Sequence, residues 1–192
     1  MKALLIIDVQ KDFCPGGALA VSQGDEIVPV INQYIHYFSS RFWPVLASRD
    51  WHPRETTHFQ NYGGPWPAHC VQNTKGAMFH PELKLPENAT VFSKGMGYDG
   101  KSYSAFLGVN GQQMGLLDYL NAKEIRELYI CGLATDYCVK ESVLDALKNG
   151  FQVTLLTDAI KGVNLQPGDA KEAVVLMKVK GAKTIEFHHL PS

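Results

Sequence analysis

The sequence contains no long apolar run and no excess of charge of either sign. Its opening apolar stretch, residues 3–7, stops at Asp8. That stretch is far shorter than the roughly 20 residues that span a bilayer, and it is too short for the core of a signal peptide. Lysine and arginine number 18 against 19 aspartate and glutamate residues, so no basic surface for a polyanion is expected. We therefore predict a cytoplasmic protein that binds neither membranes nor nucleic acid.

Cysteine is also scarce, and no disulfide framework is expected. The cysteines are Cys14, Cys70, Cys131 and Cys138, and they form no C-x-x-C pair. Without an export signal, reduced thiols are the default, which leaves one of them free to be a nucleophile. The chain of 192 residues is 45% hydrophobic, enough to build a core without cross-links. No repeat or linker-like shift in composition divides it, so residues 1–192 are predicted to form a single domain.

Apolar runs and helical patterns alternate along the chain. The runs typical of strands cover residues 3–7, 44–48, 89–92, 128–133, 153–156 and 184–187. The patterns typical of helices cover residues 27–38, 115–120, 139–147 and 170–178. This order predicts an α/β fold: a three-layer, doubly wound, mostly parallel β-sheet with helices on both faces. Residues 51–86 and 94–113 follow neither period, and loops of that length are usually functional.

Chemically useful side chains follow four of the predicted strands. They are Asp8, Asp50 with His52, Lys94, and the segment that ends at Cys138. In an open α/β sheet, ligands bind beyond the carboxyl ends of the strands, so these side chains are expected to meet. An aspartate beside a thiol can take its proton, and a lysine keeps that aspartate ionised.

Cys138 lies at the predicted start of a helix. A helix N-terminus favours thiolate over thiol, and its backbone N–H groups can hold an oxyanion. Thr135 or Asp136 is the expected N-cap. The alternative from position alone is a small buried hydrophobic residue, and it stays open at this point.

A second group of residues has the composition of a metal site. Asp50 and His52 are followed by His58 and His69 on an irregular segment, a mixed nitrogen and oxygen set that suits a divalent first-row metal. The spacing does not distinguish zinc from iron or manganese. Histidines that merely pack in an aromatic loop are the alternative.

One further motif points to a different class of protein. Residues 95–102 read G-M-G-Y-D-G-K-S and match the phosphate-binding loop directly after a predicted strand. Such a loop runs straight into a long helix, whereas Gly108 and Gly111 interrupt the residues that follow, and Asp99 would bring negative charge to the phosphates. A P-loop nucleotide-binding protein is therefore the weaker hypothesis.

Five ordered segments resemble the nicotinamidase/pyrazinamidase group of the isochorismatase-like cysteine hydrolases, over essentially the whole chain. They are Ile7–Phe13, Ser48–Pro53, Pro67–Val71, Val91–Gly95 and Gly132–Val139. The resemblance implies hydrolysis of nicotinamide to nicotinic acid and ammonia in NAD salvage, with pyrazinamide as a second substrate. Action on another small amide is the alternative within the same fold. A homo-oligomer is left open.

The resemblance also assigns roles to individual residues. Cys138 is the expected nucleophile, with Asp8 as its base and Lys94 as the third member of a triad. The backbone N–H groups of Ala134 and Cys138 would form the oxyanion hole, after a cis peptide between Leu133 and Ala134. The expected metal ligands are Asp50, His52, His58 and His69, holding zinc in preference to iron or manganese, with the metal binding the pyridine nitrogen directly or through its waters. The expected substrate-binding residues are Phe13, Trp66 and Tyr103.

Overall fold

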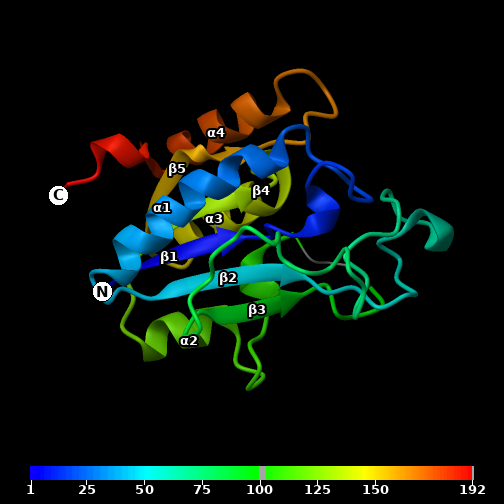
Figure 1. Ribbon diagram of the computed structural model, residues 1–192, viewed down its shortest axis with the longest axis horizontal. Helices are drawn as coiled ribbons and strands as arrows, with labels where there is room; N and C mark the ends of the chain where they lie inside the picture. The colour runs from blue at the N-terminus through cyan, green and yellow to red at the C-terminus, as the bar shows by residue number, and fades with distance from the viewer. Residues whose placement is uncertain (100–102, 192) are drawn as a thin grey trace.

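The computed structural model describes residues 1–99 and 103–191, and its centre is a six-stranded sheet (Figure 1). The strands lie in the order β3-β2-β1-β4-β5-β6, and every neighbouring pair is parallel. Their bounds are Lys2–Ile7 for β1, Val45–Asp50 for β2, Thr90–Lys94 for β3, Glu127–Leu133 for β4, Gln152–Lys161 for β5 and Lys183–Ile185 for β6. The predicted fold class is confirmed, and the sheet is parallel throughout.

In the described residues, four α-helices cover the two faces of this sheet (Figure 1). They are α1 (Val28–Ser39), α2 (Leu116–Ala122), α3 (Lys140–Lys148) and α4 (Asp169–Val179). Alternate residues of β1 point into different cores: Leu4 and Ile6 pack with α1, whereas Leu5 and Ile7 pack with the other three helices. Because both faces of β1 are covered, its sequence is an unbroken apolar run. The three layers are therefore α1, the sheet, and the group of α2, α3 and α4.

Short turns and long connections complete the chain. Single 3-10 turns cover Lys11–Phe13, Gly24–Ile27, Gln60–Tyr62, Ala105–Leu107 and Phe187–His189, and a π-helical turn covers Thr135–Val139. The long segment after β2 lies beyond the carboxyl ends of the strands, at the right of Figure 1. The ligand-binding edge of the sheet is therefore covered by residues that follow no regular period.

The phosphate-loop match is only partly within the described residues. Gly100, Lys101 and Ser102 lie outside them. In the described part that follows, Ala105–Leu107 forms a single 3-10 turn, and the next helix begins only at Leu116. The long helix that a phosphate loop requires therefore does not follow directly in the described part of the chain.

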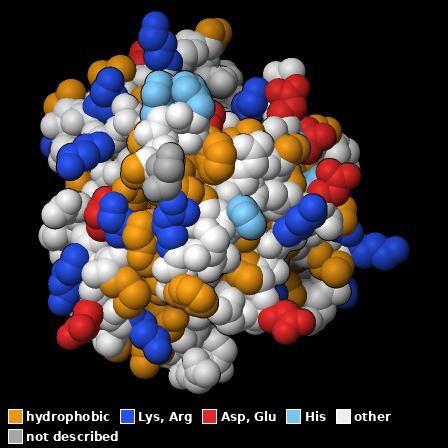
Figure 2. Space-filling view, turned by 60° about the vertical axis from the view of Figure 1, so that its left-hand side comes forward, with side chains coloured by type: hydrophobic (Ala, Val, Ile, Leu, Met, Phe, Trp, Pro, Cys, Tyr) orange, Lys and Arg blue, Asp and Glu red, His pale blue; other side chains and the backbone are white. Residues whose placement is uncertain are grey.

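None of the helices in residues 1–99 and 103–191 combines the length and the apolar character needed to cross a bilayer. On the face that Figure 2 displays, basic, acidic and apolar side chains are interspersed.

Candidate active site and metal centre

The carboxyl edge of the sheet brings Asp8, Lys94 and Cys138 together. Asp8 directly follows β1 and turns the chain with a φ of 48°, Lys94 ends β3, and Cys138 lies in the π-helical turn before α3. The Lys94 Nζ lies 2.8 Å from Asp8 Oδ2 and 3.5 Å from Cys138 Sγ. Ser48 Oγ donates a hydrogen bond of 2.7 Å to the other oxygen of Asp8. Three residues separated by up to 130 positions thus form one contact group.

Burial determines the protonation of this group. All three side chains are almost inaccessible, with Asp8 0%, Lys94 1% and Cys138 6% exposed. Burial raises the pKa of the Cys138 thiol well above its usual range, although Lys94 opposes that shift. Burial also raises the pKa of Asp8, again against the effect of Lys94. The thiol is therefore protonated at rest and needs a neighbouring base to become a nucleophile.

Asp50 connects this group to the histidines. Its Oδ1 accepts a hydrogen bond of 2.5 Å from Lys94 Nζ, and its Oδ2 lies 3.5 Å from His52 Nε2 and 3.8 Å from His69 Nε2. Burial alone would raise the pKa of Asp50, but Lys94 and the two histidines outweigh burial and hold the pKa well below its usual range. Asp50 is therefore a carboxylate shared by the lysine and the histidine cluster.

The histidine cluster has the properties of a metal site. The donor atoms of His52, His58 and His69 lie within 4.8 Å of one another, and all three residues are buried. His52 Nδ1 donates to the carbonyl of Gly95 at 3.0 Å, and His69 Nδ1 donates to the carbonyl of Pro67 at 2.8 Å. Because a carbonyl can only accept, Nδ1 of each ring carries a proton, which in the neutral ring leaves Nε2 as the nitrogen that binds a metal.

Two further observations fit a cation at this position. His52 Nε2 is buried and has no hydrogen-bond partner among the described residues. His58 stacks on His52 with ring centroids 4.6 Å apart, and burial together with the neighbouring histidines lowers its pKa to about 4. Stacked imidazoles beside the carboxylate of Asp50 suit a divalent metal, so the residues present form a site that fits one.

A family model that matches most of the sequence shows which protein family the chain belongs to. The model, described as the Isochorismatase domain, matches residues 2–187. The chain belongs to the isochorismatase family. Among curated relatives it is similar to the nicotinamidase of Escherichia coli (strain K12), with 46% identity over 94% of this chain and 92% of the relative. The resemblance seen in the sequence is thus confirmed.

Solved structures of the family are close in fold. The pyrazinamidase of Pyrococcus horikoshii in complex with zinc gives a TM-score of 0.89 at 46% identity, over 97% of this chain and 99% of that one. PnC1 from L. infantum in complex with nicotinate gives a TM-score of 0.88 at 35% identity, over 100% of this chain and 95% of that one.

In this isochorismatase-family chain, a small cavity joins the two groups of residues. The three residues expected to bind substrate line it: Phe13, Trp66 and Tyr103. Trp66 Nε1 donates a hydrogen bond of 2.8 Å to Tyr103 Oη. Cys138, Ala134, Asp50, His58 and His69 line the same cavity. The expected nucleophile, three of the four expected metal ligands and the three aromatic residues therefore surround one space, and Asp8, Lys94 and His52 lie behind this lining in contact with it.

The segment before Cys138 differs from the sequence prediction in its cap. The helical stretch begins after Ala134, with no side-chain cap, so the prediction of Thr135 or Asp136 as the N-cap was wrong. The Asp136 carboxylate instead accepts hydrogen bonds from the backbone N–H groups of Val163 and Asn164 at 2.9 and 2.7 Å. A π-helical turn changes where side chains point, so the capping rule for an ordinary α-helix did not apply. The cis peptide between Leu133 and Ala134 is present.

Several residues of the site were missed by sequence reasoning. Leu19, Tyr137 and Val163 also line the cavity. Gln10 is fully buried, donates to the carbonyl oxygen of Asp50 at 2.8 Å and accepts from the Asp50 N–H at 2.8 Å. The signals for Gln10 were its position two residues after Asp8 and its place in the segment Ile7–Phe13 that resembles the family. The partnership of Asp50 with Lys94 was missed as well, although both residues end predicted strands.

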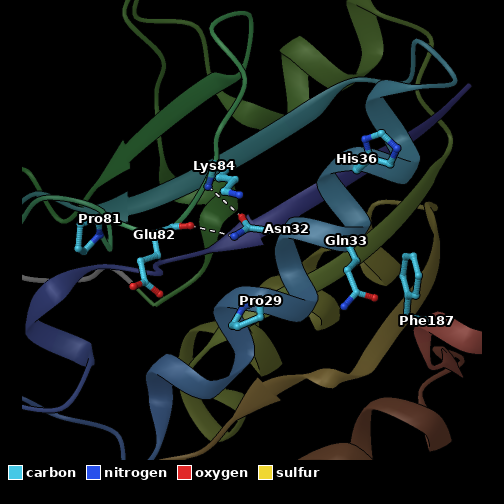
Figure 3. A pocket seen from close by; sticks show the side chains of 8 residues that line it. All are labelled: Pro29, Asn32, Gln33, His36, Pro81, Glu82, Lys84 and Phe187. Atoms are coloured by element: carbon cyan, nitrogen blue, oxygen red, sulfur yellow. Dashed lines mark hydrogen bonds between the residues drawn. The ribbon is translucent and has the colours of Figure 1, made fainter.

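A larger cavity lies elsewhere, and none of these catalytic or metal-binding residues line it. It has a volume of about 860 Å³ and lies between α1 and residues 81–84 (Figure 3). Asn32 fixes this arrangement, because its side chain donates to the carbonyl of Glu82 and accepts from the N–H of Lys84. Figure 3 shows Gln33 and His36 on the helix side of the groove. Size alone therefore does not identify the active site of this chain.

Proposed function

We propose that this protein is an amidohydrolase that converts nicotinamide to nicotinic acid and ammonia, and that it also hydrolyses pyrazinamide. The observation that carries the proposal is the joint geometry of Cys138, Asp8 and Lys94 beside the histidine cluster, around one aromatic-lined cavity. The 46% identity to the Escherichia coli nicotinamidase supports the choice of substrate.

In the proposed reaction, Asp8 takes the thiol proton as the Cys138 sulfur attacks the carboxamide carbon. Lys94 favours the ionised form of Asp8 between steps, against the effect of burial, because its ammonium lies 2.8 Å from that carboxylate. The backbone N–H groups of Ala134 and Cys138 receive the oxyanion. Ammonia then leaves with the proton from Asp8, which produces a thioester on Cys138. Water, deprotonated by Asp8, attacks the thioester and releases the acid and the thiol.

We propose that Asp50, His52, His58 and His69 hold a zinc ion. A metal bound there supplies a Lewis acid for the ring nitrogen of the substrate. Phe13, Trp66 and Tyr103 would enclose the ring, because they line the cavity next to those ligands. The Nδ1 hydrogen bonds of His52 and His69 keep both rings in the orientation that a metal requires.

The remaining expectations are part of the same proposal. The enzyme would act in NAD salvage in the cytoplasm, with residues 1–192 as a single catalytic domain. Its substrate is a small molecule, and self-association would not be needed for chemistry, because all the proposed active-site residues come from one chain.

The test is ammonia release from nicotinamide by zinc-loaded protein. Cys138→Ala should abolish turnover but leave the fold intact, because the substitution removes one sulfur atom and little core volume. Cys131→Ala is the matched control, since Cys131 is also buried but belongs to the α1-side core. Turnover that survives Cys138→Ala, or wild-type protein that releases no ammonia from nicotinamide, would overturn the proposal.

A further inference from the structure

Another cavity lies at the edge of the sheet, on the face opposite to Cys138. Its volume is about 560 Å³, and its walls come from β2, β3 and residues 109–113. Strand alternation separates it from the active site: Ala47 belongs to the α1-side core and Leu46 to the other. Arg49 therefore projects to the α1 side, whereas Asp50 projects toward the catalytic cysteine. We name this space the Arg49 cavity.

Arg49 is held in a fixed orientation within the Arg49 cavity. Its guanidinium stacks on the Trp51 ring, 3.8 Å from the centroid, and its Nε donates a hydrogen bond of 2.8 Å to Ser93 Oγ. Stacking on an indole fixes the plane of the guanidinium, and the Nε bond fixes its rotation within that plane. The two Nη groups make no hydrogen bond to any residue that the structure describes. The two Nη groups therefore have fixed directions and are available to donate hydrogen bonds to a ligand.

The charge of Arg49 is also uncompensated. Arg49 is half-buried, and no carboxylate lies within 4.0 Å of it in residues 1–99 and 103–191. No aspartate or glutamate is among the described residues that line the Arg49 cavity. A partly desolvated cation without an acid costs free energy, and an anion with two oxygens can offset that cost by accepting both Nη donors.

The other residues that line the Arg49 cavity indicate which chemical groups a bound anion should have besides its charged head. Phe79, Val91 and Met96 present apolar surface to the Arg49 cavity, whereas the side chains of Gln112 and Gln113 are exposed amides. We propose that the Arg49 cavity binds a small organic anion with a carboxylate or phosphate head on Arg49 and an apolar body against Phe79. This site is separate from the amidase centre and does not depend on the proposed function.

The experiment is calorimetric titration of the zinc-loaded protein with phenyl phosphate, benzoate and inorganic phosphate. At least one organic anion should bind with a Kd on the order of a millimolar, the affinity typical of a ligand of about ten heavy atoms. Inorganic phosphate should bind more weakly, because it has no apolar body. The organic anion that binds more tightly identifies the preferred head group.

Two variants localise the binding. Arg49→Gln should weaken binding of the organic anion about tenfold or more, since it removes both Nη donors and the charge. Gln112→Glu should weaken it about threefold or more by repulsion, and because Gln112 is exposed this variant remains informative if Arg49→Gln is unstable. Gln33→Glu, an exposed substitution in the groove of Figure 3, is the matched control and should leave Kd unchanged.

Two results would overturn the proposal. One is wild-type protein that binds neither organic anion at about 50 mM, well above the expected Kd. The other is wild-type affinity in both Arg49→Gln and Gln112→Glu, because binding at the cysteine site would survive these substitutions and binding in the Arg49 cavity would not.

Discussion

Replacement of Lys94 by methionine tests whether the lysine ammonium compensates the charge of two buried aspartates. Lys94 Nζ lies 2.8 Å from Asp8 and 2.5 Å from Asp50, whose side chains are 0% and 3% exposed. Burial would lower the pKa of Lys94, but the two aspartates outweigh burial and raise it well above its usual value. Lys94→Met keeps an unbranched side chain, one atom shorter, and removes the ammonium with its charge and its hydrogen-bond donors. It leaves two carboxylates in one buried space without a cation.

The expected cost follows from that geometry. Removal of one partner from a buried ion pair destabilises a protein by about 3–5 kcal/mol, because the remaining charge is uncompensated. Part of the cost is recovered when a carboxyl takes up a proton, since two carboxylates so close together cannot both stay ionised. At pH 7.5 we therefore expect the free energy of unfolding of Lys94→Met to fall by about 3 kcal/mol or more.

The pH dependence has a definite sign. In the variant, the folded-state pKa of the carboxyl that takes up the proton lies above its unfolded value of about 3.9. Between the unfolded and the folded pKa, the folded state therefore holds up to one proton more than the unfolded state. The free energy of unfolding falls as pH rises through this range. The difference from wild type should be smaller at pH 5.5 than at pH 7.5, by up to about 1.4 kcal/mol per pH unit.

The assay is urea denaturation of metal-free protein at both pH values, followed by ammonia release from the zinc-loaded form. Lys84→Met, at an exposed position, is the control and should change stability by less than about 0.5 kcal/mol. Activity of Lys94→Met should fall by about 100-fold or more. A Lys94→Met variant with wild-type stability at pH 7.5, or with a deficit independent of pH, would refute the charge argument.

Three other perturbations have expected outcomes. Gly132 has a φ of +115°, and an added Cβ would overlap the backbone of β1, so Gly132→Ala should destabilise the fold by about 2 kcal/mol or more. Gly150 has a φ of +83° but open space around it, so Gly150→Ala should cost only about 1 kcal/mol in the same urea assay. Burial and the hydrogen bond to Asp158 raise the pKa of Tyr34, so the free energy of unfolding of the wild-type protein should fall as pH rises above about 10. In Tyr34→Phe, the fall of the unfolding free energy with pH in this range should be smaller by about 1.4 kcal/mol per pH unit. His69→Ala should lower zinc affinity about tenfold or more, measured by competition with a chelator.

The fold could be predicted because of how the layers cover the sheet. Strands buried on both faces are apolar throughout, so β1 was evident as an unbroken run. β5 was predicted to end at Leu156 and instead continues to Lys161, past Thr157 and Asp158. A register shift between Ile130 and Gly132 lies where the extended β5 pairs with β4. Local hydropathy does not reveal such a continuation, because the neighbouring strand causes it.

The candidate site was only partly predictable for a related reason. Asp8, Lys94 and Cys138 were found because each follows a strand, and the carboxyl ends of parallel strands share one edge. The role of Gln10 depends on two hydrogen bonds to the backbone of Asp50, 40 residues away. Contacts of that kind depend on how a loop folds over the sheet, and neither periodicity nor spacing encodes them.

The register of β2 against β3 connects the active site with the Arg49 cavity. Asp50 pairs with Lys94 and Arg49 pairs with Ser93, so the two cross-strand pairs are neighbours on opposite faces of the sheet. A slip of one residue would turn Lys94 toward α1 and present Ser93 to the cysteine, because side chains alternate with a period of two. The register that places an ammonium between two aspartates on one face therefore also places a guanidinium against a serine on the other. Any change that shifts these strands should alter both sites together, whereas Gln112→Glu acts on the Arg49 cavity alone.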